Sequence, residues 1–426
     1  MRYLKLILLV LAMSVASETR AQIVADSSRN GIHTIQLFKS GFELSLPLIK
    51  LGSDEKVTLS FDDLENELRN FKYSLELCNS DGTTSNLPLN RYMEGFAEEQ
   101  IRNFSYSVNT IQTYIHYETE IPGQNMLLLK SGIYRVKVYE ENNPDSILFS
   151  RFFYVLDEKC TINGRVMQAT LIEQKKFKQE VDLKVRVNSD FEIAESYKNL
   201  KLIIRQNGRS DNAITTLKPR LSVANEFDYN YDRENTFNGG NEYRMFDVKS
   251  LRYFSEHTQD ITFNNQINNV YLTPDQRRPF KVYKTEEDLN GKFYIKANDT
   301  RDSRVEADYF FAHFSLPYEF PVVDGDIYLL GELTDWQLKP EAKLIYNYPQ
   351  KAYQTTLWLK QGYYNYFYVF VKKGETILDE TFVEGNHWET ENDYYVFIYY
   401  RDPSDNYDRL IGYRKFNSIN DNKAED

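Results

Sequence analysis

Short segments in which apolar and polar side chains alternate recur along the chain, and they restrict its fold more than any other feature. Residues 180–187 read EVDLKVRV, and residues 73–77 read YSLEL. A period of two places alternate side chains on opposite faces of an extended strand, whereas a helix needs apolar residues three and four apart. Because no helical pattern extends beyond about 12 residues, the sequence predicts an all-β fold.

Further strands are predicted by the same alternation or by short apolar and aromatic runs. They lie at residues 34–48 (with a break at Ser40-Gly41), 57–61, 134–139, 152–155, 200–206, 227–231, 292–295, 309–316, 326–330, 353–359, 364–371 and 394–400. Aromatic residues make up 15% of the chain, and they are favoured on pleated sheets. Short strands separated by turn sequences such as Asn207-Gly208 predict consecutive immunoglobulin-like antiparallel β-sandwich domains.

The length of 426 residues allows two to four domains. Pro317 and Pro321 bracket an expected linker. We therefore expect a signal peptide at residues 1–21, an N-terminal β-sandwich domain at 22–158, a middle β domain at 159–320, a C-terminal immunoglobulin-like domain at 321–416 and a polar tail at 417–426.

The first 21 residues have the pattern of a secretory signal peptide. Arg2 and Lys5 precede an apolar run over residues 6–16, and Thr19 and Ala21 suit the −3 and −1 positions of a cleavage site. Cleavage would change the formal net charge from −12 to −14, because it removes three basic residues and one acidic residue. An acidic chain is disfavoured as a partner of nucleic acid. We expect a protein that acts outside the cytoplasm.

The chain has two cysteines, Cys78 and Cys160. In an oxidising compartment they could form a disulfide, and otherwise they are two small buried side chains. Their spacing does not decide between these alternatives.

No compact catalytic or metal-binding motif is apparent. The five histidines lie far apart, and the sequence has no nucleophile elbow, P-loop or dinucleotide-binding glycine motif. We predict no catalytic residue, no metal site and no cofactor. A glycosidase carboxylate pair stays open among 63 acidic residues. Residues 402–408 read DPSDNYD, which suits a solvated acidic turn better than a calcium loop because the glycine and final glutamate of an EF-hand are missing.

The segment around residue 240 is unusual because two glycines lie between asparagines, aromatic residues and charges. A hairpin turn that leads into a strand would explain it. Alternatively it is an exposed recognition loop, since binding residues collect on loops held by a rigid scaffold. The candidate partner-binding residues are Asn238, Gly239, Gly240, Asn241, Glu242 and Arg244.

Residues 327–338, IYLLGELTDWQL, followed by LWLKQGYYNYFY at 357–368, resemble glycogen- and starch-binding immunoglobulin-like modules. In those modules the sugar rests on two tryptophans, and Trp336 matches the first. Thr376 stands where the second is expected. The resemblance therefore implies the immunoglobulin-like fold of these modules but not their sugar-binding site, since one of the two tryptophans is missing. We expect Trp336 to be a packed aromatic residue.

A broader resemblance covers nearly the whole chain and is carried by many separated motifs in order. They are residues 77–81, 91–96, 109–117, 131–134, 205–213, 238–247, 288–291, 306–309, 389–394 and 407–412. Together they resemble the type IX secretion system plug protein family of Bacteroidetes. One departure from the family pattern is Gly82, where the family more often has tryptophan.

The resemblance implies a non-enzymatic periplasmic protein at the inner face of the outer membrane. It would bind the periplasmic opening of the large outer-membrane β-barrel translocon and seal it, without a small-molecule substrate. Two other functions remain open from the residues alone: a carbohydrate-binding accessory protein, and a secreted hydrolase with a carboxylate pair that the sequence does not reveal.

Overall fold

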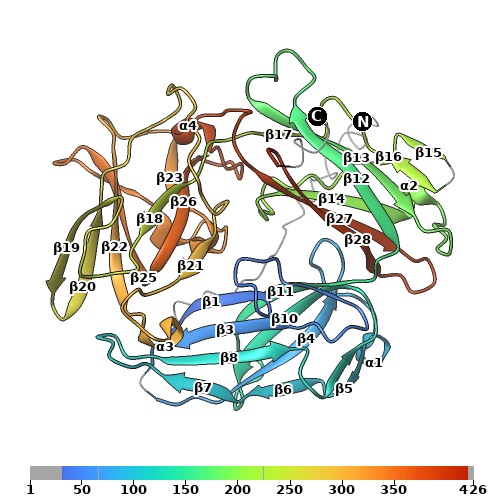
Figure 1. The fold of residues 1–426 in the computed structure, drawn as a ribbon, viewed down its shortest axis with the longest axis horizontal. Helices are drawn as coiled ribbons and strands as arrows, with labels where there is room; N and C mark the ends of the chain where they lie inside the picture. The colour runs from blue at the N-terminus through green and yellow to red at the C-terminus, as the bar shows by residue number, and fades with distance from the viewer. Residues whose placement is uncertain (1–30, 66, 224, 421–426) are drawn as a thin grey trace, which may run out of the picture.

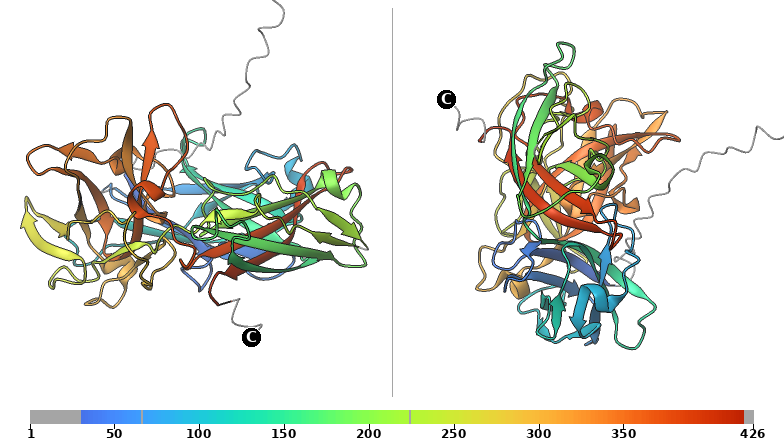
Figure 2. Two further views of the ribbon diagram at one scale, coloured as in Figure 1. Left: turned by 90° about the horizontal axis from the view of Figure 1, so that it is seen from above. Right: turned by 90° about the vertical axis from the view of Figure 1, so that its right-hand side faces the viewer.

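Three β-sandwich lobes arranged around a common centre make up the computed structural model, which describes residues 31–65, 67–223 and 225–420 (Figure 1). In the right-hand view of Figure 2, the blue lobe 1 lies below the other two. The all-β architecture predicted from the sequence is confirmed. The predicted signal peptide at residues 1–21 lies outside the described residues.

Lobe 1 comprises residues 31–157 and packs two sheets face to face. One sheet has the order β1-β3-β8-β7, formed by β1 (Ile32–Lys39), β3 (Val57–Asp63), β8 (Ile115–Ile121) and β7 (Asn103–Tyr106). The other has the order β2-β11-β10-β4-β6, formed by β2 (Leu48–Lys50), β11 (Ile147–Leu156), β10 (Gly132–Glu140), β4 (Phe71–Cys78) and β6 (Glu98–Ile101). The remaining elements are β5 (Met93–Gly95), β9 (Met126–Leu128) and α1 (Leu89–Tyr92). Between the sheets, Phe61, Phe71 and Phe149 are fully buried, because inward positions alternate with polar ones along each strand.

Lobe 2 combines residues 160–238 with the C-terminal strands. One sheet contains β12 (Cys160–Gln168), β13 (Lys178–Val187), β16 (Glu226–Asp228), β15 (Leu221–Val223) and β17 (Thr236–Asn238). The other has the order β14-β27-β28, formed by β14 (Leu200–Gln206), β27 (Asp393–Arg401) and β28 (Asp408–Asn417). The short helix α2 (Ser196–Asn199) precedes β14. Val185, Ile204 and Ile398 meet in the core.

Lobe 3 is formed by residues 244–390. One set of strands is β18 (Arg244–Asp247), β26 (Gly362–Lys372), β21 (Phe293–Ile295) and β23 (Gly325–Leu330). The facing sheet has the order β19-β20-β22-β25-β24, formed by β19 (Thr258–Asn264), β20 (Ile267–Leu272), β22 (Tyr309–Pro317), β25 (Ala352–Lys360) and β24 (Ile345–Asn347). The short helices are α3 (Ser303–Glu306), α4 (Thr381–Glu384), η2 (Glu332–Thr334) and η3 (Pro340–Ala342). Phe246, Phe310 and Tyr368 lie in the core.

The strand pairing groups the chain differently from the expected domains. The expected border at residue 320 falls inside lobe 3, where β22 pairs with β25 from Tyr309↔Lys360 to Pro317↔Ala352. The strand β27, expected in the C-terminal domain, instead pairs with β14 of lobe 2 from Leu200↔Tyr400 to Gln206↔Tyr394. The border was misplaced because the periodicity of a strand identifies its faces but not the strand that it pairs with.

Candidate functional site

The predicted recognition segment crosses from lobe 2 to lobe 3 and is largely buried. Asn238 ends β17 and is exposed, whereas Gly239 and Glu242 are buried and Arg244 begins β18 with 9% of its surface exposed. A Cβ atom at Gly239 would lie only 1.9 Å from the carbonyl oxygen of His387, so only glycine fits there.

The remaining candidate residues are also held by neighbouring chain. The amide of Asn241 donates to the carbonyl of Glu384 at 2.8 Å, and the backbone N–H of Gly240 donates to Asn386 at 3.0 Å. The expectation of an exposed recognition loop is therefore corrected, because Glu242 and Arg244 are enclosed at the junction between lobes 2 and 3. The alternative of a turn leading into a strand describes the segment better.

At this junction Arg209 of lobe 2 pairs with Glu380 of lobe 3, and further buried ion pairs lie beside it within lobe 3. The guanidinium of Arg244 lies 2.9 Å from Glu384 and 2.8 Å from Asp275, and Arg278 lies 2.7 Å from the same Glu384. Burial raises the pKa of Glu384, but the two arginines more than compensate and the net shift is downward, so the carboxylate stays ionised. A buried carboxylate whose charge is fully compensated favours a single arrangement of its neighbours, because moving a partner away leaves the charge buried and unpaired.

Glu242 is the exception in this junction, because none of the residues that the structure describes pairs a cation with its carboxylate. Its Oε1 accepts hydrogen bonds from the hydroxyl of Tyr283 and the backbone N–H of Glu391, while its Oε2 is buried and has no hydrogen-bond partner among the same described residues. Burial raises the pKa of Glu242 to about 7 and that of the neighbouring Asp288 to about 6.

This environment predicts a pH dependence of stability. Between about pH 4.5 and 7 the folded protein keeps a proton on Glu242 that the unfolded chain has released, so stability is lost as the pH rises through this window. The variant E242Q cannot ionise. From pH 4 to pH 8 the stability of E242Q relative to the wild type should therefore rise by about 3 kcal/mol. Urea unfolding of both proteins at the two pH values measures this, and a constant difference would contradict it.

A second buried cluster joins lobe 1 to lobe 3. Asp62 accepts hydrogen bonds at Oδ2 from Lys360 at 2.6 Å and from the hydroxyl of Tyr309 at 2.7 Å, and its Oδ1 lies 2.7 Å from Nδ1 of His116. The Tyr309 hydroxyl also contacts Thr34 Oγ1 at 2.6 Å. The side chains of Asp62 and Lys360 are each 1% exposed. Burial raises the pKa of Asp62, but Lys360 and His116 more than compensate, and the net shift is downward.

A third buried cluster joins lobe 1 to lobe 2 and involves the predicted acidic turn at residues 402–408. Asp408 is fully buried and accepts hydrogen bonds from the backbone and hydroxyl of Ser80, from Lys201 at 2.8 Å and from Arg401 at 2.9 Å. The end of the turn is thus part of an inter-lobe contact. Within the described ranges, no group of three histidine, cysteine or acidic side chains is placed to hold a metal ion.

Both cysteines are free thiols in the structure. Cys78 lies in an apolar cluster between lobes 1 and 2, and Cys160 lies in the core of lobe 2. Burial raises the pKa of Cys78 to about 11 and that of Cys160 to about 12, so both stay protonated. The possible disulfide is not formed, and the alternative of two small buried side chains describes them.

Trp336 is packed against its own lobe. Its indole lies edge-on to Tyr243 with the ring centroids 6.1 Å apart, and a Cβ atom at Gly291 would lie 2.2 Å from the indole. Thr376, at the position of the second platform tryptophan, is exposed. A half-buried indole beside a threonine does not reproduce a two-tryptophan sugar platform.

We expect the variant W336A to lose about 2 kcal/mol of unfolding free energy, less than the 3–5 kcal/mol typical of a fully buried aromatic residue. Urea unfolding measures the loss, and a glycan array probed with both proteins provides the second readout. A well-folded W336A that selectively loses a glycan signal would contradict the packing role.

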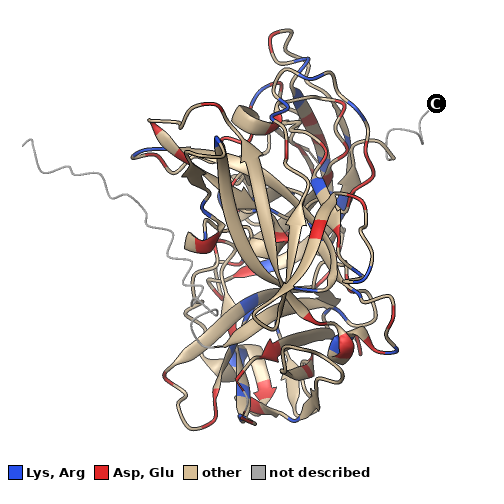
Figure 3. Cartoon of the chain, turned by 90° about the vertical axis from the view of Figure 1, so that its left-hand side faces the viewer, with Lys and Arg blue, Asp and Glu red and all other residues tan. Residues whose placement is uncertain are grey.

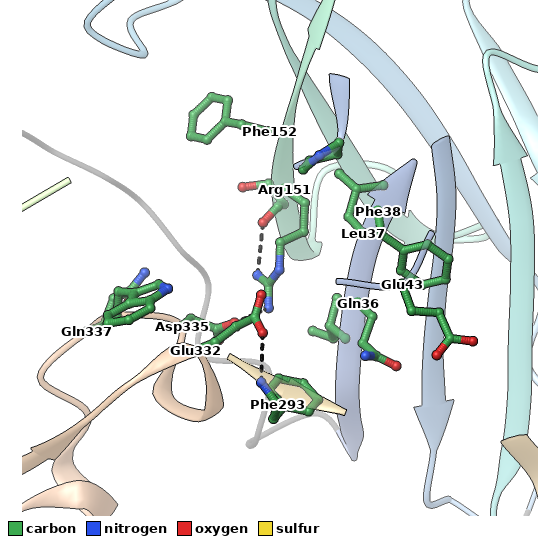
Figure 4. Close-up of a pocket in the computed structure, with 14 residues that line it drawn as sticks. Gln36, Leu37, Phe38, Glu43, Arg151, Phe152, Phe293, Glu332, Asp335 and Gln337 are labelled. Carbon is green, nitrogen blue, oxygen red and sulfur yellow. Dashed lines mark hydrogen bonds and ion pairs between the residues drawn. The ribbon is translucent and has the colours of Figure 1, made fainter. Parts of the chain in front are cut away.

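A cavity of about 200 Å³ lies between lobes 1 and 3 beside Trp336 (Figure 4). Arg151 reaches into it from β11 but already pairs with Asp335 at 2.7 Å, and Glu332 accepts a hydrogen bond from the backbone N–H of Phe293 at 3.1 Å. Small-molecule sites usually measure about 300–1,000 Å³. The cavity is smaller than that range and its one basic side chain, Arg151, is already paired, so it is better described as a gap between lobes.

Charged residues of both signs are interspersed along the elements visible in Figure 3. On the side shown, they do not form the basic stripe typical of nucleic-acid-binding surfaces. Over the residues that the structure describes, no helix has the length and apolar character needed to cross a bilayer.

Comparison with known proteins identifies relatives of the chain. Residues 32–157 match the type 9 secretion system plug protein 1st domain. The crystal structure of a hypothetical protein from Parabacteroides merdae has 36% sequence identity and a TM-score of 0.88, and the match covers 91% of this chain and 97% of that chain. A comparison with curated proteins finds no match. The resemblance found in the sequence is therefore confirmed, and the chain belongs to the type 9 secretion system plug protein family.

Proposed function

We propose that this protein is a non-enzymatic periplasmic plug that binds the periplasmic opening of the large outer-membrane translocon of the type 9 secretion system and seals it. The family supports a role related to this secretion system, and it is a plug family and not an enzyme family. Membership of this family also implies that the protein associates with the secretion system.

The observation that supports sealing is the set of three buried polar junctions. Asp62 with Lys360 joins lobe 1 to lobe 3, Ser80 with Asp408 joins lobe 1 to lobe 2, and Arg209 with Glu380 joins lobe 2 to lobe 3. Because each lobe is fixed to both others, the sandwiches cannot hinge independently without leaving a buried charge incompletely paired. A body that closes an opening needs this resistance to deformation, and it needs no catalytic group.

Binding is tested by affinity purification of the tagged full-length protein from detergent-solubilised envelope, with the recovered proteins identified by mass spectrometry. One very large outer-membrane barrel should co-purify. Recovery of glycan-uptake proteins instead would overturn the proposal in favour of the carbohydrate-binding alternative.

Sealing is tested separately in cells that lack the protein. Their outer membrane should become permeable to a large antibiotic that intact cells exclude, and the full-length protein should restore exclusion. Unchanged permeability in cells where the translocon is present would contradict sealing, even if binding is observed.

A further inference from the structure

The most exposed large hydrophobic side chains gather at one end of lobe 3. In the described part of the chain, nine such side chains are at least 65% exposed, and seven of them belong to this end. We call these seven the distal patch: Phe280, Val282, Phe320, Val323, Ile345, Tyr348 and Ile377. Phe280 and Val282 are 94% and 93% exposed. The other two, Ile172 and Tyr197, are in lobe 2.

The strand register places these side chains at the same end of the sandwich. The start of β23 pairs with the end of β26 at Gly325↔Lys372, so residues 318–324 and 373–378 are neighbours. The end of β22 pairs with the start of β25 at Pro317↔Ala352, which adds residues 345–351. The segment that carries Phe280 begins at this end too, because the backbone N–H of Asp275 donates to Ser315.

Contacts between these loops hold them in a defined conformation, so the patch is exposed on a structured surface. The Arg277 guanidinium lies 4.6 Å from the centroid of the Tyr318 ring, and Arg278 is bound to the buried Glu384. Tyr346 donates a hydrogen bond to the carbonyl of Tyr318 at 2.9 Å, and Lys373 donates to that of Val323 at 2.8 Å. Apolar side chains held in this way on an ordered surface indicate an interaction site.

The opposite end of lobe 3 is already occupied by lobe 1. Lys360, at the far end of β25, binds Asp62, and the backbone N–H of Val108 donates to Val305 of α3. In Figure 1, α3 lies against lobe 1 while α4 lies at the other end of lobe 3. The distal patch therefore faces away from the junction between lobes 1 and 3.

The chemistry of the patch favours a protein partner over a membrane. Three of the lysines around it are paired with acidic residues, namely Lys284 with Glu286, Lys372 with Glu375, and Lys343 with Asp326, each at 2.8 Å, and the exposed Glu319 and Asp324 beside Phe320 and Val323 add negative charge. Attraction to anionic lipid needs uncompensated basic charge. Seven side chains that each expose roughly 100 Å² or more provide about 700 Å² of apolar surface, close to the ~800 Å² that each partner buries in a standard protein interface.

We propose that the distal patch is the docking face of this protein, and that it binds an apolar protein surface at the periplasmic opening of the translocon. This inference rests on the proposed function. It assigns the contact to the free end of lobe 3 in place of residues 238–244.

The test compares three full-length proteins: the wild type, the patch variant F280S/V282S, and the control I172S/Y197S, which removes equally exposed hydrophobic side chains from lobe 2. Binding to the detergent-solubilised translocon is measured by biolayer interferometry. We expect the wild type and the control to bind alike and the patch variant to bind about tenfold more weakly or worse, because exposed anchors dominate interface energies. Circular dichroism of the variants checks their fold.

The outcomes separate the two proposals. If the wild type does not bind the translocon, the proposed function fails. If the wild type and the patch variant bind equally, the proposed function stands and the docking face is overturned. Sedimentation velocity and flotation with anionic liposomes are measured in parallel. A patch variant that loses only self-association or only liposome binding would assign the patch to a second copy or to a bilayer, and would also overturn the inference.

Discussion

Replacing Lys360 with methionine should lower the free energy of unfolding by about 3–5 kcal/mol, because the substitution leaves a carboxylate buried without its cation. Asp62 is fully buried, and its Oδ2 lies 2.6 Å from the lysine ammonium. His116 and Tyr309 would still contact Asp62, but they supply less compensating charge. Methionine fills a similar volume, so the loss reports mainly the charge and not a cavity.

Tryptophan fluorescence during urea unfolding can follow this junction, because the indole of Trp358 is stacked on Tyr309 with the ring centroids 5.8 Å apart. The double variant D62N/K360M is the matched control. It removes both charges, and it should recover much of the lost stability. A single variant K360M with the wild-type urea midpoint would show that the pair does not hold lobe 1 to lobe 3.

Reversing the charge of Arg244 should destabilise the protein by more than about 4 kcal/mol, since a glutamate there would face two carboxylates in a buried site. The Arg244 side chain is 8% exposed and pairs with Glu384, which is 2% exposed, and with Asp275. The same substitution in an exposed loop would leave stability nearly unchanged and weaken a partner contact. The two readings of the segment at residues 238–244 thus differ in a measurable way.

The control for this variant is K198E, because the Lys198 side chain is 78% exposed and makes only a surface pair with Glu195. Its effect should stay within about 0.5 kcal/mol. Urea unfolding gives the stability of both variants, and interferometry against the translocon gives binding. An R244E protein with unchanged stability and lost binding would restore the recognition-loop interpretation.

Strand positions were predictable because they depend on local alternation. The predicted strand at residues 200–206 coincides with β14, and β4, β10 and β13 contain the segments predicted at 73–77, 134–139 and 180–187. β28 was missed, because Gly412 interrupts its pattern where the chain packs against the thiol of Cys160.

The candidate site was predicted in part. The glycine pair at residues 239 and 240 correctly marked a place of unusual backbone packing, since a side chain at 239 would meet His387. Its burial could not be predicted, because the segment that covers it follows almost 150 residues later and carries no local signal toward it. The distal patch was likewise invisible, since Phe320 and Ile345 look like core residues until their neighbours are known.

By itself, the sequence determined the β class, the positions of most strands and the family, because side-chain alternation and ordered motifs are properties of neighbouring residues. The tertiary structure alone decided that β27 and β28 return to lobe 2, that Arg244 is enclosed while Phe280 is exposed, and that buried polar contacts join each lobe to the other two. Burial and pairing result from contacts between residues far apart in the chain, and the free energy of a charge or an apolar side chain depends on those contacts.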